Sequence, residues 1–317
     1  MSIIDTVLQD PDLIAEPPVL LDVGASGGVF PDWKAIAPYA VCIAFDPDQR
    51  EMGYVERSSS GFKRLIVYNS ILHDREVERA EFYLTRSPYC SSVLPPLTEK
   101  LGAWAFHRLF EVVEKTTMPA VTLGRVLAEQ QLTRVDWFKS DSQGMDLRLF
   151  QSLGESNLRR VLMAQFEPGI IDAYGGEDSL ASVLAFMQQR GFWMSDIAIH
   201  GSQRIGVAAR GALPPVLARN VHHLVRTSPG WGELTYLNTF EGEWSRRDLL
   251  LGWVLATIRA QHGFALELAI KGTATHGGEL FERLRRSSLH RLRTRLPVAA
   301  FQAALAVLRA VKHRLLS

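Results

Sequence analysis

Cysteine is scarce in this chain of 317 residues, which has only Cys42 and Cys90. Two cysteines form neither a disulfide framework nor the spaced ligand set of a zinc site, so a reducing compartment is expected. The N-terminus, MSIIDTVLQDPD, lacks the basic start and apolar run of a signal peptide. No stretch reaches the ~18 uninterrupted apolar residues that a membrane-spanning helix requires. We therefore expect a cytoplasmic protein, with contact at the inner face of a membrane left open.

A charge excess of one sign is also missing, because the net charge is only +1. The charges are unevenly placed, however. From Arg283 to Ser317 there are nine Lys or Arg and no Asp or Glu, which leaves residues 1–282 at −8. A basic helical tail of this kind can lie on an anionic membrane, or it can pack on the domain or on another subunit while its arginines stay solvated. Nucleic-acid binding is not expected, because the basic residues are not interleaved with exposed-looking aromatics.

Short apolar runs alternate with helical patterns through the first two thirds of the chain. Near-continuous apolar runs are typical of strands buried on both faces of a parallel sheet. The expected strands cover residues 19–23, 40–46, 64–69, 135–139, 161–167, 191–199 and 232–240. Helical spacing lies between them, at residues 123–130 and 147–153. The alternation predicts an α/β doubly wound fold with a mostly parallel seven-stranded sheet.

This pattern divides the chain into three segments. Residues 1–17 are expected to be a lead-in helix, residues 18–243 the main domain, and residues 244–317 a basic helical C-terminal extension. Residues 84–118 interrupt the main domain with three prolines and a cluster of aromatics. Such an insertion is often functional, and we interpret it as a lid over the substrate.

The glycine-rich turn DVGASGG, residues 22–28, comes directly after the first strand. Glycines at such a turn let a ligand approach the backbone closely. The dinucleotide pattern G-x-G-x-x-G is absent, which argues against a nicotinamide cofactor. Asp22, two residues before Gly24, would repel a pyrophosphate but suits a ligand with an ammonium group. S-adenosylmethionine has such a group and no phosphate.

Asp46 ends the second strand, 24 residues after Asp22. An acidic residue at that position can accept hydrogen bonds from both ribose hydroxyls of a nucleoside. Together with the glycine turn, it indicates a nucleoside ligand that needs no phosphate. The alternative is an ordinary tight turn and, after the second strand, an ordinary solvated loop.

The block VDWFKSDSQGMDLRLF, residues 135–150, ends an apolar strand in charged residues. In an open parallel sheet, ligands bind beyond the carboxyl ends of the strands, so Lys139 and Asp141 are expected beside the reactive end of the cofactor. Glu167, at the tip of the next strand, is a second nearby carboxylate. Asp146 is interpreted mainly as an acidic residue that favours the start of a helix. These carboxylates could also hold Mg²⁺, although they lack a fixed spacing.

With these motifs, the chain resembles the FkbM-type S-adenosylmethionine-dependent methyltransferases. The resemblance covers about residues 18–200 and depends on VLLDVGASGG, CIAFDPD, the Ser91-Ser92 pair and above all the 139–146 block. Asp146 replaces the usual glutamate of that block, Ser26 stands where asparagine is common, and Gly124 stands where an aspartate usually comes after Thr-Leu. The resemblance implies a class I methyltransferase fold and O-methylation of sugars, glycan units or related natural products.

We expect the cofactor to be held by the two turns and by the end of the third strand. The expected residues are Asp22, Gly24, Ala25, Ser26, Gly28, Asp46, Pro47, Asn69 and Ser70. The catalytic candidates are Asp141, Lys139 and Glu167, where Asp141 with Lys139 would orient or deprotonate the acceptor hydroxyl. Ser91, Ser92 and Gln143 are expected to face the acceptor. His107 remains an alternative base, and a non-catalytic binding or assembly module in glycan synthesis remains the alternative function.

Overall fold

The computed structural model describes residues 2–25, 30–48 and 61–296. It divides into two compact units, one of residues 16–241 and one that combines residues 1–15 with the chain from Gly242 onward. No helix in the described residues is long and apolar enough to cross a membrane.

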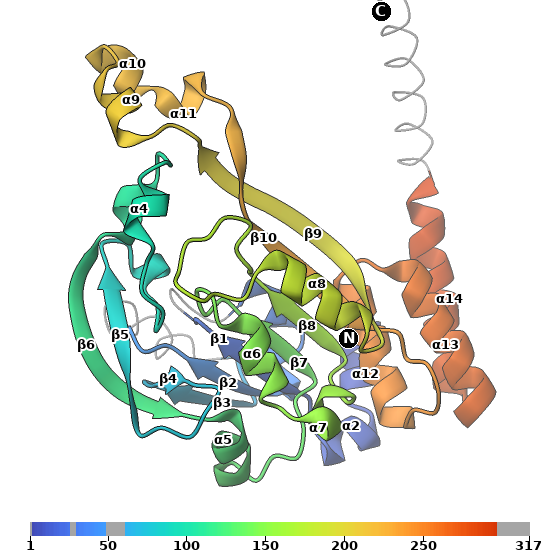
Figure 1. Ribbon diagram of the computed structural model, residues 1–317. Coiled ribbons are helices and arrows are strands. Elements are labelled where there is room, and N and C mark those ends of the chain that lie inside the picture. The colour runs from blue at the N-terminus through green and yellow to red at the C-terminus, as the bar shows by residue number, and fades with distance from the viewer. Residues whose placement is uncertain (1, 26–29, 49–60, 297–317) are drawn as a thin grey trace, which may run out of the picture. The chain divides into compact units, whose positions relative to one another are not determined.

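The larger unit is built on a seven-stranded sheet, and this confirms the predicted α/β fold (Figure 1). All neighbouring strands are parallel except the pairs that involve β10. In spatial order, the strands are β3 (Arg64–Tyr68), β2 (Val41–Phe45), β1 (Val19–Val23), β7 (Trp137–Ser140), β8 (Met163–Phe166), β10 (Thr227–Asn238) and β9 (Phe192–Gln203). The chain order therefore reverses between β1 and β7, where a ligand is expected in this fold.

Every residue of β1 and β2 is buried, as their unbroken apolar sequences predict. Phe138 of β7, Phe166 of β8 and Phe150 of the adjacent helix pack edge-to-face or tilted, with ring centroids 5.1–6.0 Å apart. On the other side of β7, Trp137 packs edge-on against Trp33 at 5.9 Å. Buried aromatics on both faces of β7 fix the position of the strand tip that carries the charged block of residues 139–146.

Short helices connect the strands of this unit. They are η1 (Pro31–Ala35), η2 (Ala37–Tyr39), η3 (Pro88–Cys90), α4 (Thr98–Leu101), η4 (His107–Phe110), α5 (Leu123–Glu129), α6 (Asp146–Gln151), α7 (Glu155–Leu158), α8 (Leu180–Gln188), α9 (Val207–Gly211), α10 (Pro215–Arg219) and α11 (Val221–Leu224). Helix α5 begins behind Thr122, whose side chain accepts a hydrogen bond from the amide of Arg125, as is typical of a threonine cap.

The interruption at residues 84–118 is part of a second sheet that the sequence analysis did not anticipate. Strands β5 (Arg79–Thr85) and β6 (Val112–Val121) form an antiparallel pair, and β4 (Ile71–Leu72) pairs with β6 in parallel. The prolines and aromatics of the interruption fill the connection between β5 and β6. That connection carries η3, α4 and η4.

The smaller unit is wholly helical in its described residues. Its helices are α1 (Ile3–Leu8), α2 (Pro11–Ala15), α12 (Arg246–Ile258), α13 (His262–His276) and α14 (Glu279–Thr294). Arg246, the first residue of α12, connects this helix to the N-terminal segment. Its guanidinium contacts the carboxylates of Asp10 and Asp12 at 2.6–2.7 Å. The described part of the basic C-terminal segment, α14, buries Phe281 and Leu284.

Candidate active site at the tips of β1 and β7

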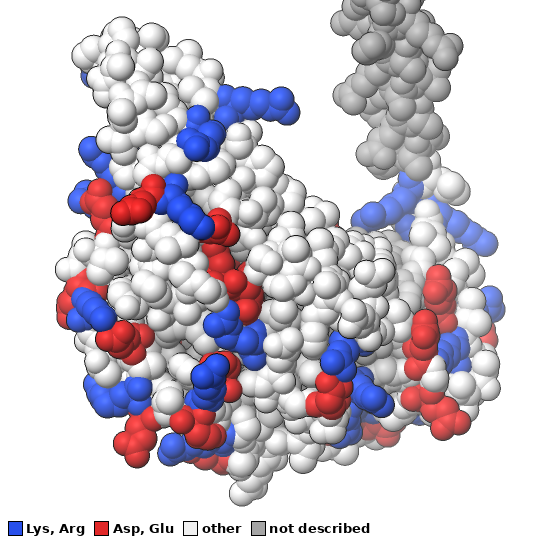
Figure 2. All heavy atoms as spheres, viewed as in Figure 1, with Lys and Arg blue, Asp and Glu red and all other residues white. Residues whose placement is uncertain are grey.

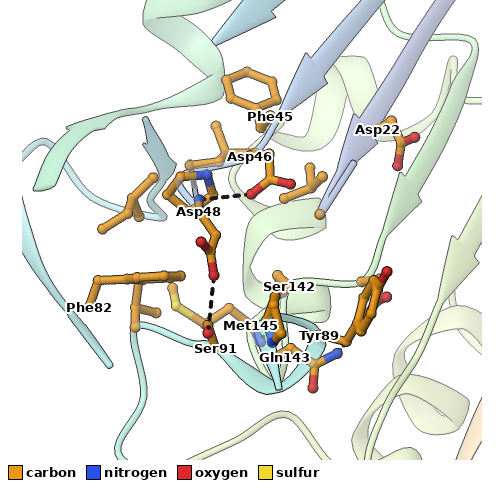
Figure 3. Close-up of a pocket in the computed structure, with 18 of the residues that line it drawn as sticks. Asp22, Phe45, Asp46, Asp48, Phe82, Tyr89, Ser91, Ser142, Gln143 and Met145 are labelled. Atoms are coloured by element: carbon orange, nitrogen blue, oxygen red, sulfur yellow. Dashed lines mark hydrogen bonds between the residues drawn. The ribbon is translucent and has the colours of Figure 1, made fainter. Parts of the chain in front are cut away.

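Two cavities meet at the carboxyl ends of the central strands. The first, of about 310 Å³, lies over β1 and β2 (Figure 3). The second, of about 300 Å³, lies over β7 and β8 and beneath the connection between β5 and β6. Asp141, Gln143 and Tyr89 line both cavities. These three residues therefore lie at the boundary between two adjoining spaces.

The first cavity contains acidic residues from two neighbouring strand ends. Asp22 of β1 is almost fully buried, as are Asp46 and Asp48 after β2. The backbone amide of Asp48 donates to Oδ1 of Asp46 at 2.8 Å, and Ser91 Oγ lies 3.4 Å from Oδ2 of Asp48 (Figure 3). Ser91 was expected to face the acceptor, but it lines this first cavity. Its hydroxyl instead helps to position the acidic loop.

The predicted cofactor residues fall into three groups. Asp22, Gly24, Asp46 and Pro47 line the first cavity. Ser26 and Gly28 lie outside the described residues. Ala25, Asn69 and Ser70 are not among the lining residues: Ala25 packs against Ala44, Asn69 is exposed, and Ser70 is buried beside the cavity.

Apolar side chains complete the first cavity, and the sequence analysis missed them. Ile71 and Leu72 of β4, Phe82 of β5 and Met145 line it together with Phe45. The two-residue strand β4 comes directly after the exposed Asn69 and the buried Ser70, so the prediction stopped just short of the lining residues. No sequence periodicity marks a strand of two residues.

Lys139 lies beside Asp22 because the two residues are register partners across β1 and β7. The Lys139 ammonium is 2.9 Å from Oδ1 of Asp22. Burial disfavours the charged form of Lys139, but the carboxylates of Asp22 and Asp141 outweigh this effect and hold its pKa above the usual value. Lys139 therefore keeps its proton, and acceptance of a proton from an acceptor hydroxyl stays a prediction for Asp141. Asp22 and Lys139 together face the first cavity as an ion pair.

Asp141 and Glu167 form a hydrogen-bonded pair of carboxyl groups. Burial raises the pKa of Asp141 to about 6, although the charge of Lys139 opposes the shift. Burial and the charges of Asp141 and Asp146 raise the pKa of Glu167 to about 9. Near neutral pH, Glu167 is therefore protonated and Asp141 is mainly ionised. Asp141 is a stronger base here than an ordinary carboxylate.

Gln143 holds Asp141 in place. Its Nε2 lies 2.5 Å from Oδ1 of Asp141, and its Oε1 lies 2.9 Å from the hydroxyl of Tyr174. The backbone of Gln143 has a φ of 57°, which is uncommon for a residue with a side chain. Ser92 supports this conformation, because its hydroxyl donates to the carbonyl oxygen of Gln143 at 2.8 Å. Ser92, predicted to face the acceptor, is fully buried and lines neither cavity, and its contact is with Gln143.

Asp146 does more than begin a helix, so its interpretation as a residue that mainly favours a helix start was incomplete. It is the first residue of α6 and is fully buried. Its Oδ1 accepts from the hydroxyls of Ser140 and Ser142 and from the Ser142 amide, and its Oδ2 accepts from the Glu167 amide. Asp146 thus ties the ends of β7 and β8 together. Its oxygens are committed to these bonds, and no group of three His, Cys, Asp or Glu in the described residues could hold a metal ion.

The second cavity has mainly apolar walls. Five aromatic side chains in the described part of the chain line it: Tyr89, Phe106, Phe110, Tyr174 and Trp231. The rings of Phe106 and Trp231 stack at 6.2 Å with an interplanar angle of 7°. Asp141, Glu167 and Glu177 supply its acidic groups, and its lining includes neither Lys nor Arg among the described residues. His107 lies outside both linings, with Nδ1 3.0 Å from the carbonyl oxygen of Trp104.

Tyr174 is a site residue that the sequence analysis overlooked. Its hydroxyl also lies 2.8 Å from the carbonyl oxygen of Cys90, so it links the connection between β5 and β6 to Gln143. Burial raises the pKa of Tyr174 well above its usual value, so its hydroxyl keeps its proton. The glycines in AYGGED, residues 173–178, mark a tight loop after a strand and were the available signal.

Comparison with known families assigns a family to the same region. Residues 22–194 match the model of the methyltransferase FkbM domain. No curated protein matches the chain. Among solved structures, precorrin-6y C5,15-methyltransferase from Geobacter metallireducens GS-15 is 10% identical, with 74% of this chain and 87% of that chain covered and a TM-score of 0.31. NSun6 from Pyrococcus horikoshii is 13% identical, with 75% and 51% covered and a TM-score of 0.27.

Proposed function

Because this chain belongs to the FkbM methyltransferase family, we propose that it transfers a methyl group from S-adenosylmethionine to a hydroxyl group of a sugar, a glycan or a related natural product. One observation carries the proposal: Asp141, a buried carboxylate with a raised pKa, lines both cavities at their boundary. A base at that position adjoins both a donor space and an acceptor space.

The residues of the first cavity fit the donor by their chemistry. Asp46 and Asp48 offer carboxylate oxygens for ribose hydroxyls, and Phe82 and Leu72 offer apolar surface for a purine. Asp22 and Lys139 offer opposite charges for the ammonium and carboxylate of the methionine part. When bound, S-adenosylmethionine would supply an electrophilic methyl group. Mg²⁺ plays no part in this proposal, because the chemistry needs only a base.

The proposed mechanism divides the work between three side chains. Oδ2 of Asp141 accepts the proton of the acceptor hydroxyl, while its Oδ1 is held by Gln143. Glu167 keeps its own proton and donates a hydrogen bond to Asp141, which restrains the carboxylate. The aromatic walls exclude water from the acceptor.

The charge of the second cavity narrows the acceptor class. Three carboxyl groups and no cationic side chain stand among its described lining residues, so a phosphate or carboxylate on the acceptor would be desolvated without a partner. Aromatic rings suit the apolar face of a sugar or another ring. We therefore propose an uncharged or amine-bearing hydroxylated ring as the acceptor.

The first test is cofactor binding and turnover. Calorimetry should detect binding of S-adenosylmethionine and of its homocysteine product, and uncharged sugars should be methylated in preference to their phosphorylated or carboxylated forms. Failure of the folded protein to bind either nucleoside would refute the proposal. Binding without turnover on any acceptor would favour a non-catalytic binding or assembly module.

The second test is Asp141→Asn. Loss of the base should lower kcat by about 10²–10⁴ while cofactor binding is retained. Asp196→Asn is the matched control, because Asp196 is exposed on β9 and lines neither cavity. Unchanged turnover in Asp141→Asn would exclude Asp141 as the base.

A further inference from the structure

The paired strands β9 and β10 extend beyond the sheet into an arm that ends in helices α9, α10 and α11 (Figure 1). We define the arm tip as residues 204–226. Four large apolar side chains of the tip are exposed by 41–64% of their area: Val207, Val216, Leu217 and Leu224. No residue of α9 or α10 is buried. Large apolar side chains in such a cluster usually mark a binding surface.

The charges of the arm have one sign. Residues 197–232 contain four arginines and three histidines but no Asp or Glu. Arg204, Arg219 and Arg226 are exposed at the tip. In Figure 2, the end of the arm is mainly white with blue side chains beside it, and the acidic side chains lie lower on the molecule. This surface is complementary to an anionic partner.

We propose that the arm tip docks on an anionic phospholipid membrane. Of the large apolar side chains on α9, α10 and α11, only Val221 is buried, and the other four are exposed. An acyl layer accepts such side chains without a matching shape. Basic residues beside them add attraction to anionic headgroups. An anionic membrane surface offers both an apolar layer and negative charge, and so matches both features of the tip.

The position of the arm relates this docking to the second cavity. The Val207 amide donates to the carbonyl oxygen of Gly102 at 3.2 Å, and Arg204 and Arg210 donate to the carbonyl oxygens of Ala103 and Ala105. The segment that receives these bonds continues into Phe106 and Phe110, which line the cavity. A membrane at the tip would therefore lie on the acceptor side of the domain. The docking itself does not depend on the proposed activity.

Flotation of the full-length protein with vesicles tests the proposal. We expect binding to vesicles that contain phosphatidylglycerol, weaker binding to phosphatidylcholine alone, and release by high salt. Val216→Asp with Leu217→Asp should lower the partition coefficient at least about tenfold, because two apolar contacts are lost. Val112→Asp with Val113→Asp is the control, since these residues are 42% and 59% exposed on β6 and lie outside the tip as defined above.

The charge contribution has its own pair of variants. Arg219→Glu with Arg226→Glu should lower vesicle binding by about tenfold or more. Arg159→Glu with Arg160→Glu is the control, because it changes the net charge by the same amount on exposed residues elsewhere in the same unit. The control variant should bind vesicles almost as well as the wild type. Equal loss in both pairs, or full binding in the tip variants, would overturn the proposal and direct attention to the basic C-terminal segment. Absence of vesicle binding by the wild-type protein would also overturn the proposal. If the wild type then proved to be a dimer and the tip variants monomers, the tip would be a contact between two copies of the chain.

Discussion

At the scale of single residues, the candidate site contains two buried pairs of ionisable side chains. One is the ion pair of Asp22 with Lys139, and the other is the carboxyl pair of Asp141 with Glu167. Asp22 and Lys139 lie 2.9 Å apart, and the carboxylate of Asp22 helps to hold the pKa of Lys139 above its usual value. Asp141 and Glu167 share a hydrogen bond, and mutual repulsion keeps one of them protonated. The first pair suits binding of a zwitterion, and the second suits proton transfer.

The carboxyl pair predicts the pH dependence of methyl transfer. Only ionised Asp141 can accept a proton, so kcat/KM should rise with pH through about 6, the raised pKa of Asp141. Glu167→Gln keeps a neutral hydrogen-bond donor and should leave this acid limb in place. Glu167→Ala removes the donor that stabilises the ionised form, so the limb should move to higher pH and activity at acidic pH should fall roughly fivefold to tenfold. A wild-type profile that falls with rising pH through this range, or identical profiles for both variants, would contradict the assignment.

At the scale of elements, the strand tips are held close together by backbone contacts. The amide of Asp141 donates to the carbonyl oxygen of Val23 at 2.9 Å, so the turn after β1 lies against the turn after β7. Gly24 has a φ of +81°, and a Cβ there would lie 2.2 Å from the carbonyl oxygen of Asp141. The glycine is therefore required by this contact between two turns, in addition to any approach of a ligand.

Gly24→Ala tests this contact. We expect a loss of about 2 kcal/mol or more in the free energy of unfolding, from backbone strain together with the clash, and a clear loss of cofactor affinity. Gly154→Ala is the matched control, because Gly154 has a φ of +76° but open space around its Cβ position. Gly154 has a ψ of 155°, a region that almost only glycine adopts, so this variant should lose about 1–3 kcal/mol from strain alone, and less than Gly24→Ala loses. Urea denaturation and calorimetry measure both quantities, and equal losses in the two variants would show that the clash contributes nothing.

At the scale of the whole molecule, the residues that line the two cavities all belong to one unit. They span Asp22 to Trp231, within residues 16–241. The other unit has its own ion pairs, between Arg246 and the acidic residues of α2 and its flank, and its own buried residues along α12. The two cavities are thus built from the larger unit alone, as far as the described residues show.

Hydrogen exchange of the full-length protein tests this division. S-adenosylhomocysteine should slow exchange of amides at the ends of β1, β2 and β7, because its binding suppresses local opening there. Amides of α12, α13 and α14 should exchange at unchanged rates. Equal protection of amides in the helical unit would show that this unit takes part in binding the cofactor. An Asp22→Asn variant that does not bind S-adenosylhomocysteine is the control, because any protection it shows is unrelated to cofactor binding.

The sequence alone determined the class of the fold and predicted where the candidate site lies. Unbroken apolar strands, a glycine turn after the first strand and charged residues at strand ends are local patterns, and they are sufficient to place Asp22, Asp46 and Asp141 at one edge of a parallel sheet. The seven-stranded sheet and the family match confirmed the fold. The burial of residues in β1 and β2 is a direct consequence of their composition.

Only the tertiary structure decided which charges pair and which residues meet. Lys139 lies beside Asp22 through strand register, Asp146 is committed to four hydrogen bonds, and Tyr174 meets Gln143 from 31 residues away. These contacts join segments whose separation along the chain carries no periodic signal. The exposure of the arm tip is likewise a tertiary property, because an apolar residue in a short helix has the same sequence pattern whether a neighbour covers it or not.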